Sequence, residues 1–368
     1  MPATQIIAEA GVNHNGGMDM ALRLVDAAVE AGADMVKFQT FDARKLANRH
    51  APKAAYQQRT TGTDESQFEM LQRLQLSRAD HERLIAHCAN RGIQFLSSAF
   101  DIDSFHLLHR DFGLRLMKLG SGELTNAPLL YAIGQSGCDL ILSTGMATLA
   151  EVEEALSVLA YAMLGGRAPG RVAFSEALRD PAAWDLLRCR VTLLHCTTEY
   201  PAPMGETNLR AMDTLRAAFG LRVGFSDHTV GRVASSAAVA RGAVVIEKHM
   251  TLDRTLPGPD HAASMEPVEF RELVDDIRAV EAALGTGIKQ PSPNEIGNIP
   301  IARKGLVAAR DLPAGHVLTI DDIAVRRPAT GRSPMDFWDF VGSTLTAPCD
   351  EGDPPRAVSS HQTSPSGE

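Results

Sequence analysis

The stretch from Val223 to His261 constrains the fold of this chain more than any other part of its sequence. Two short apolar runs, Leu221–Phe225 and Ala243–Glu247, have β-strand character and flank an alanine-rich helical segment. Each run is followed by a histidine in a polar cluster, His228 after the first and His249 after the second. Strand–helix–strand units of this kind are typical of parallel α/β sheets and barrels, whose strand ends meet at one face. We therefore expect the two histidines to bind one metal ion together at the mouth of a barrel.

The same alternation of strands and helices extends over about the first 285 residues. Eight such units predict a (β/α)8 TIM barrel. A doubly wound sheet would gather its polar groups at one switch point, whereas here every predicted strand end carries some. Residues 165–190 show no regular pattern and predict an irregular connection. The six further predicted strands are Gln5–Ala8, Asp34–Gln39, Ile93–Ser97, Arg115–Leu119, Asp139–Leu142 and Val191–Leu194.

A smaller domain is predicted to follow the barrel. The barrel occupies residues 1–285 and ends with a helix at Pro267–Leu284. Residues 286–300 are rich in Gly, Pro, Lys and Asn, which indicates a linker. Residues 301–350 contain short strands and turns, as expected of a small β-rich module. Residues 351–368 are rich in Pro, Ser, Gly and Glu, and this composition predicts a disordered tail.

Charge and composition disfavour several classes of function. The net charge of −9 argues against nucleic acid or an anionic membrane as a partner. No apolar run approaches the roughly 20 residues of a membrane span. The amino-terminal segment has the pattern of a strand rather than of a secretory signal. The five cysteines are scattered without CxxC spacing, as expected of reduced thiols. These features predict a cytoplasmic protein.

Polar side chains gather where the predicted strands end, which is the face that carries the active site in TIM barrels. Two lysines, several hydroxyls and glycine-flanked amides have the chemistry of a phosphate-binding site. Two histidines would suit a divalent metal ion completed by water and a substrate oxygen. Glu9 and Glu123 are candidate general bases. The strand-end residues are Glu9, Lys37, Gln39, Ser97, Ser98, Lys118, Ser121, Glu123, Ser143, His195, Thr198, Ser226, His228, Glu247 and His249.

These residues also have a purely structural interpretation. A single lysine near a strand end most often lies in solvent or in a salt bridge, and His14, His195 and His249 could each be satisfied core histidines. The functional interpretation is favoured by coincidence, because at least seven of the eight predicted strands end in polar residues at one face. Histidines on the predicted helices and the long loop are expected at the surface: His50, His81, His87, His106 and His109.

Motifs in both predicted domains resemble those of the sialic acid synthases, which condense phosphoenolpyruvate with an N-acetylmannosamine-type sugar. GVNHNG, VKFQT, LHCTTEYPAP, GFSDHT, IEKHMTLD and PGPDH occur in this order, and RRPATG follows in the small module. The resemblance covers about residues 5–348 and is highly specific. It implies a TIM barrel joined to an antifreeze-like (SAF, β-clip) domain. It also implies a domain-swapped homodimer in which that domain lies over the partner's barrel.

The resemblance assigns roles to individual residues. His228 and His249 would bind Mn²⁺ or Mg²⁺, and no organic cofactor is implied. Glu123 would handle proton or water chemistry with Glu9 near it, and Arg327 would arrive from the other subunit. Gln39, Tyr200 and Asp260 would hold the amino sugar. Phosphoenolpyruvate would be held by Lys37, Ser98, Lys118, Ser121, Ser143, Thr198 and Ser226.

The first expectation for the function is an N-acetylneuraminate synthase, a transferase that uses N-acetylmannosamine. The alternative is an N,N'-diacetyllegionaminate synthase, whose sugar, 2,4-diacetamido-2,4,6-trideoxymannose, differs only at C4 and C6. GVNHNG leans away from pseudaminic acid synthases but does not separate these two. Other classes considered are a Schiff-base aldolase using Lys118 or Lys248, and a carbohydrate- or ice-binding protein built on the small module. The full set of strand-end polar residues argues against the binding protein.

Overall fold

The computed structural model describes residues 3–48, 53, 58 and 66–358 of the 368-residue chain. It comprises two compact units, Met1–Gly285 and Thr286–Glu368, and each is described by itself. None of the helices in the described part of the chain has the length and apolarity of a membrane span.

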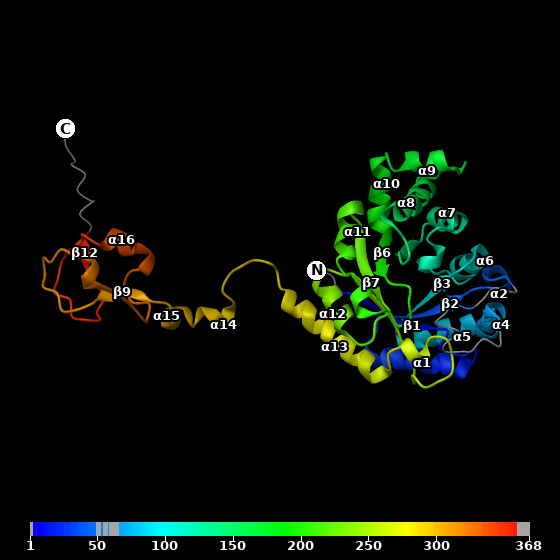
Figure 1. Cartoon of the computed structure of the whole chain (residues 1–368), viewed down its shortest axis with the longest axis horizontal. Helices are drawn as coiled ribbons and strands as arrows, with labels where there is room; N and C mark the ends of the chain where they lie inside the picture. Colours follow the sequence, from blue (N-terminus) through cyan, green and yellow to red (C-terminus); the bar gives the residue numbers. More distant parts are fainter. Residues whose placement is uncertain (1–2, 49–52, 54–57, 59–65, 359–368) are drawn as a thin grey trace. The chain divides into compact units, whose positions relative to one another are not determined.

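The first unit is a closed barrel of eight parallel strands in which the last strand pairs with the first (Figure 1). The predicted TIM barrel is therefore confirmed. Most strands extend beyond their predicted carboxyl ends, because polar rather than apolar residues form those ends. The strands are β1 (Gln5–Gly11), β2 (Met35–Thr40), β3 (Gln94–Ala99), β4 (Leu116–Leu119), β5 (Asp139–Ser143), β6 (Val191–Cys196), β7 (Arg222–Asp227) and β8 (Val245–His249).

Helices surround this barrel, and local sequence signals mark where several of them begin and end. Ser77 and Thr148 each form a capping box that begins a helix. Gly32 and Gly92 end two helices in the left-handed conformation, which glycine adopts without steric cost. The principal helices are α1 (Met18–Ala31), α4 (Gln67–Leu74), α5 (Arg78–Arg91), α6 (Ile102–His106), α7 (Ala127–Ser136), α8 (Leu149–Met163), α11 (Ala211–Phe219), α12 (Val233–Ala240) and α13 (Pro267–Leu284), with the short α2 (Ala43–Leu46).

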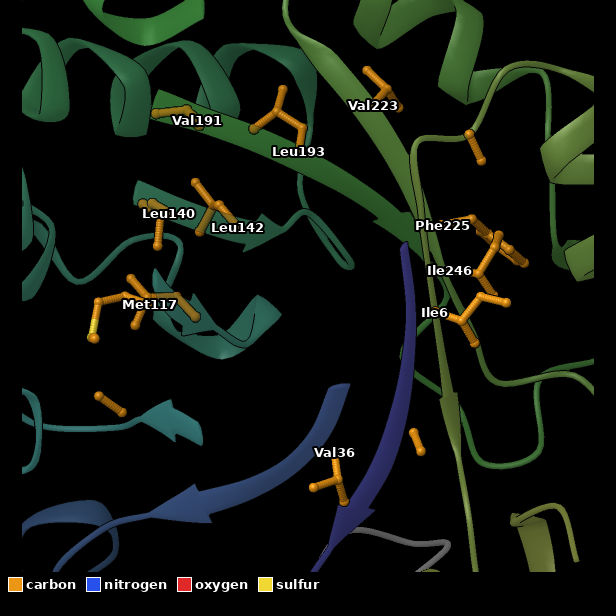
Figure 2. Packing of buried hydrophobic residues seen from close by; sticks show 14 of the residues in the cluster. Ile6, Val36, Met117, Leu140, Leu142, Val191, Leu193, Val223, Phe225 and Ile246 are labelled. Carbon is orange, nitrogen blue, oxygen red and sulfur yellow. The ribbon is translucent and has the colours of Figure 1, made fainter. Parts of the chain in front are cut away.

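Alternating side chains of each strand divide between two cores. One set packs between the strands and the helices, as Figure 2 shows for Ile6, Val36, Met117, Leu140, Leu142, Val191, Leu193, Val223, Phe225 and Ile246. The opposite set forms a second apolar cluster, consisting of Ile7, Met35, Leu96, Ile141, Leu194 and Val245. Each fully buried aliphatic side chain contributes roughly 1.5–3 kcal/mol of hydrophobic stabilisation. The second cluster closes the interior of the barrel beneath the polar strand ends.

Two sequence-based expectations about the barrel were wrong. The segment expected to be irregular contains α9 (Arg171–Ala177) and α10 (Pro181–Arg190). The second of these begins at a capping aspartate followed by proline, a local signal that the weak amphipathic pattern obscured. His81, expected at the surface, is buried, and its Nε2 lies 2.7 Å from Thr40 Oγ1. His87, His106 and His109 are partly exposed, and His50 lies outside the described residues.

The second unit is a small β-rich module. β9 (Gly305–Ala308) pairs antiparallel with β10 (Ile323–Arg326), and β11 (Thr344–Leu345) with β12 (Ala357–Val358). Its core consists of Leu306, Ala308, Leu312, Leu318, Ile323, Phe340, Leu345 and Cys349. Of two short helices, α14 (Pro293–Ile296) lies within the segment predicted to be a linker, and α15 (Ile299–Ala302) spans the end of that segment.

The predicted start of the disordered tail at residue 351 was wrong for the residues that the structure describes. Strand β12 lies within that tail and pairs with β11. The amide of Ala308 donates a hydrogen bond of 2.8 Å to the carbonyl of Asp353, and the amide of Thr346 donates one of 2.9 Å to the carbonyl of Arg356. Backbone pairing of this kind does not require apolar side chains, so composition did not reveal it. Residues 359–368 lie outside the described part.

Candidate active site

A layer of polar side chains lies inside the barrel, directly above the second apolar cluster described above. Side chains two residues apart on a strand point to the same face, so residues two positions beyond those of the cluster enter this layer. Ile7 is followed in this way by Glu9, and Met35 by Lys37. Ser98, Lys118, Ser143, Ser226 and Glu247 enter from the other strands by the same alternation. All seven are buried.

Four of these residues form a buried cluster of charges. Lys37 forms an ion pair with Glu9, and its Nζ lies 3.7 Å from Glu247 Oε2. Lys118 Nζ lies 3.7 Å from Glu247 Oε1, so Glu247 bridges the two lysines. Buried charges are costly unless they are paired. The cluster balances two lysines against two glutamates.

The pKa values of the two glutamates in the cluster are shifted in opposite directions. Burial raises the pKa of Glu9 to about 7, opposed by Lys37 and reinforced by the charge of Glu247. Burial would also raise the pKa of Glu247, but Lys118 and Lys37 outweigh it and lower this pKa to about 2. The pKa of Lys118 is lowered, mainly by burial. Glu247 is therefore the permanent anion of the cluster, and Glu9 exchanges its proton near neutral pH.

Each of the two ammonium groups donates a hydrogen bond to a serine hydroxyl. Lys37 donates to Ser98 Oγ at 3.1 Å, and Lys118 donates to Ser143 Oγ at 2.7 Å. Ser226 donates to Glu247 Oε1 at 3.0 Å. Each serine that accepts from a lysine keeps its own O–H for another acceptor. Two ammonium groups and neighbouring hydroxyls can together bind a small anion with several oxygen atoms.

A second group of polar atoms surrounds Gly145, just beyond the end of β5. The amide of Gly145 donates to Ser121 Oγ at 2.9 Å, and this oxygen lies 3.1 Å from Cys196 Sγ. A side chain on Gly145 would begin only 2.8 Å from Ser121 Oγ and 2.9 Å from Cys196 Sγ, and it would also overlap Thr198 Oγ1. Thr198 Oγ1 is buried without a hydrogen-bond partner in the described part of the chain. Only a residue without a side chain therefore lets these three polar groups lie so close to the backbone at this position.

The two predicted metal ligands lie side by side at the ends of β7 and β8. The ring centroids of His228 and His249 are 5.6 Å apart, and the ring of Tyr200 lies 4.2 Å from the first and 5.3 Å from the second. His228 Nδ1 donates to the carbonyl of Thr197 at 2.6 Å, because a carbonyl can only accept. Burial lowers the pKa of His228 to about 4 and that of His249 well below its usual value. Both rings are therefore neutral at physiological pH.

These histidines have the chemistry of metal ligands. The hydrogen bond to Thr197 fixes the proton of His228 on Nδ1, so Nε2, which lies 3.3 Å from Ser226 Oγ, carries the lone pair that a metal ion would take. His249 Nδ1 is buried without a hydrogen-bond partner in the residues described. Those residues contain no group of three or more His, Cys, Asp or Glu side chains that could hold a metal. A divalent ion would thus have two protein ligands and take its other ligands from water or substrate.

The other predicted site residues lie at different positions. Glu123 is half-buried in a 3₁₀ turn after β4, accepts from Asn126 Nδ2 at 2.7 Å, and has a pKa raised mainly by burial. Asp260 is buried, which raises its pKa to about 6. Gln39 is partly exposed near the end of β2, with its Nε2 close to Gly11. Arg327 belongs to the second unit, where it directly follows β10 and is exposed.

Three features of the site were missed by the sequence-based assignment of roles. Glu247 was recognised as a strand-end residue, but its bridging of two lysines depends on distances that no motif encodes. The carbonyl of Thr197 belongs to the backbone and leaves no trace in residue type. Gly145 could have been noticed as a glycine within the Ser143–Met146 strand end, where a side chain would collide with polar groups from neighbouring strand ends.

The chain matches known proteins over most of its length. Residues 24–289 match the model of the NeuB family and residues 303–356 that of the SAF domain. The chain is 47% identical to N,N'-diacetyllegionaminic acid synthase of Campylobacter jejuni, over 94% of this chain and 97% of that protein. It is 42% identical to the synthase of the same name from Legionella pneumophila, over 93% and 90%.

A solved structure shares the fold. The N-acetylneuraminic acid (sialic acid) synthetase of Leptospira borgpetersenii, crystallised with citrate, superposes with a TM-score of 0.64. It is 30% identical and covers 81% of this chain and 90% of its own. The family model spans well over half of the chain, and both relatives match nearly full length. The chain is an enzyme of the NeuB family of sialic and nonulosonic acid synthases, with a TIM barrel followed by a SAF domain.

Proposed function

We propose that this enzyme is an N,N'-diacetyllegionaminate synthase that condenses phosphoenolpyruvate with 2,4-diacetamido-2,4,6-trideoxymannose and releases phosphate. The observation that carries the proposal is the identity of 47% and 42%, over nearly the whole chain, to two proteins named as legionaminic acid synthases. The structure named as a sialic acid synthetase is only 30% identical. The comparisons thus favour the legionaminate alternative over the N-acetylneuraminate synthase that was the first expectation.

The buried layer of the barrel supports the binding of phosphoenolpyruvate. Lys37 and Lys118 each carry a hydroxyl partner, Ser98 and Ser143, and they face one another across Glu247. The carboxylate and phosphate of the substrate would draw on these ammonium groups and on Ser226. Ser121 and Thr198, beside Gly145, offer further hydroxyls. Such fixed groups stabilise negative charge without reorganisation, which is electrostatic rather than covalent catalysis.

The proposed reaction forms one carbon–carbon bond and breaks one carbon–oxygen bond. C3 of phosphoenolpyruvate attacks the aldehyde carbon of the open-chain sugar, and the aldehyde oxygen takes up a proton. Water adds at C2 and gives up a proton. The C2–O bond to phosphate then breaks, phosphate leaves with the bonding electrons, and the hydroxyl on C2 loses its proton to become the keto group. Glu123, half-buried with a raised pKa, would accept the proton of the water, with Glu9 as a second proton carrier.

The paired histidines support a divalent metal ion, Mn²⁺ or Mg²⁺, as the cofactor. His228 and His249 would hold it, and when bound it would supply Lewis-acid polarisation of the aldehyde oxygen. Tyr200 lies against both rings and would contact the sugar there. Asp260 and Gln39 would complete the binding of the sugar hydroxyl and amide groups.

A Schiff-base mechanism has less support. Lys248 points to the outer face of β8, where its Nζ lies 2.9 Å from Asp227 Oδ2 and donates to the carbonyl of Thr229. It is therefore turned away from the barrel interior. Lys118 lies inside the barrel, and borohydride treatment with substrate would reveal any imine it forms. A trapped adduct on Lys118 would contradict the electrostatic mechanism.

The SAF domain suggests that two subunits build each site. By family resemblance, Arg327 would reach the barrel of the partner subunit in a domain-swapped homodimer. Complementation between two inactive variants tests this: Arg327→Ala and His249→Ala would be mixed after partial dissociation. Activity recovered in the mixture supports a shared site, because one mixed site then carries neither substitution. A mixture that stays inactive although mixed dimers form would contradict it.

Phosphate release from phosphoenolpyruvate with Mn²⁺ tests the proposed function. The enzyme would be assayed with N-acetylmannosamine and with 2,4-diacetamido-2,4,6-trideoxymannose, and kcat/KM compared. We expect a preference of at least about tenfold for the second sugar, about 1.4 kcal/mol in transition-state binding. Preference for N-acetylmannosamine would reverse the assignment to a neuraminate synthase. Phosphate release with neither sugar, in folded and metal-loaded protein, would contradict both.

A further inference from the structure

Asp227 and Lys248 form a buried ion pair on the outer face of the barrel wall. They are register partners on β7 and β8, and their side chains are almost wholly inaccessible to solvent. By strand alternation this outward pair lies between two inward pairs. The pair before it is Ser226 and Glu247, at 3.0 Å. The next residues along the two strands are His228 and His249.

Hydrogen bonds from this pair enclose the backbone of His228. Asp227 Oδ1 accepts from the amide of Thr229 at 2.8 Å and from its hydroxyl at 2.7 Å. Lys248 Nζ donates to the carbonyl of Thr229 at 2.6 Å. The residues before and after His228 are thus tied together, and both are tied to the residue that precedes His249. Ser235 on α12 adds a 2.6 Å hydrogen bond to Asp227 Oδ2.

Stability alone does not account for this ion pair. Desolvating two charges costs about as much as their attraction returns, and apolar residues of similar volume often replace such a pair without loss of stability. What the pair does provide is a fixed geometry, because each charge accepts or donates in several directions at once. Slippage of β7 against β8 would break the two contacts that cross between the strands, Lys248 with Asp227 and Lys248 with the carbonyl of Thr229, and would separate the two histidines.

We propose that Asp227 and Lys248 are positioning residues that hold His228 and His249 at the separation required to share one divalent metal ion. The inference rests on the metal site in the proposed function. Neither residue touches the ion, and both act through the backbone of the neighbouring histidines. Outer residues that orient metal ligands typically contribute 10- to 100-fold to affinity.

The test is the Mn²⁺ affinity of the full-length protein without substrates, measured by electron paramagnetic resonance of the free ion. The variant is Asp227→Asn/Lys248→Met, which removes both charges together, keeps side-chain volume and leaves an acceptor for Thr229. The control is Arg278→Met, which breaks a pair with Asp34 at the opposite end of the barrel. We expect the double variant to bind Mn²⁺ at least about tenfold more weakly and the control to bind it normally.

A milder variant keeps the inference falsifiable if the double variant does not fold. Ser235→Ala removes only the hydrogen bond from α12 to Asp227, and Ser236→Ala on the same helix removes one to the helix's own carbonyl at Arg232. We expect weaker Mn²⁺ binding from the first and unchanged binding from the second. Parent-like affinity in the folded double variant, or in Ser235→Ala if the double variant is unfolded, would overturn the inference while leaving the metal site intact. A parent protein that binds no Mn²⁺ would overturn the proposed metal site and the inference together.

Discussion

Glu9 and Glu247 share Lys37 as a charge partner, yet their pKa values move in opposite directions. The pKa of Glu9 is raised to about 7 and that of Glu247 is lowered to about 2. The difference has a physical origin: Glu247 also faces Lys118 and accepts from Ser226, whereas Glu9 has Lys37 as its main counter-charge. The barrel interior thus holds one fixed carboxylate and one that changes charge near neutrality.

This arrangement predicts how a Glu9→Gln substitution alters the pH dependence of stability. A carboxyl group with a raised pKa binds more protons in the folded state, so its contribution to stability falls as pH rises from about 4.5 to about 7. The substituted amide resembles the protonated acid at every pH. We expect the variant to match the parent near pH 5 and to exceed it by about 1–3 kcal/mol at pH 8, measured by urea unfolding. A variant that is less stable at pH 8 would mean that the ion pair with Lys37 is net stabilising.

Removal of one metal ligand should separate metal binding from folding. His249→Ala is expected to abolish Mn²⁺ binding and to lower kcat at least about 1,000-fold, because polarisation of the aldehyde is lost. Parent protein treated with a chelator should lose activity and regain it with Mn²⁺. Circular dichroism checks that the fold is retained. Full activity in protein shown to be metal-free would contradict the role of both histidines.

Ser143, beside Lys118, should contribute to the binding of phosphoenolpyruvate but not to that of the sugar. Ser143→Ala removes the hydroxyl that accepts from Lys118 and is available to an anion. A hydrogen bond to a charged group is worth about 1.5 kcal/mol or more. We therefore expect the KM for phosphoenolpyruvate to rise about tenfold while the KM for the sugar is unchanged. Ser236→Ala, on the outside of the barrel, serves as the control, and an equal rise in both KM values would argue against a role specific to the phosphoenolpyruvate site.

Residues 351–358 should contribute to the stability of the SAF domain. A chain ending at residue 350 loses β12 and the hydrogen bonds accepted by Asp353 and Arg356, whereas a chain ending at 358 keeps them. We expect the shorter chain to show rapid proteolysis confined to the second unit, and the longer one to behave as the parent. Equal resistance of both truncated chains would show that β12 adds little to this domain.

Sequence patterns sufficed where the fold depends on alternation and periodicity. The eight strands and the face to which their polar ends belong followed from apolar runs and turn residues, since parallel strands must end on one side. Helix α13 was placed at the residues observed, because an early proline marks its start. Helices α9 and α10 were not found, since their exposed residues lack a strong apolar stripe.

The energetic relations within the site could not be derived in the same way. The opposite pKa shifts of Glu9 and Glu247 depend on which lysines lie near each carboxylate. The proton position on His228 depends on a backbone carbonyl 31 residues away. The proposed choice of sugar rests on whole-chain similarity, because the motif GVNHNG does not separate the two kinds of synthase.

Gly145 also allows the hydroxyl groups of the site to be tested apart from its charges. The nearest atoms that a side chain there would meet are the tips of Thr198, Ser121 and Cys196, which lie closer than a carbon atom can approach. A Gly145→Ala substitution would therefore displace these tips, whereas Lys37 and Lys118 are held by their own ion pairs with Glu9 and Glu247. Such a protein would report what the Ser121 and Thr198 hydroxyls add to the binding of phosphoenolpyruvate while the two lysines stay in place.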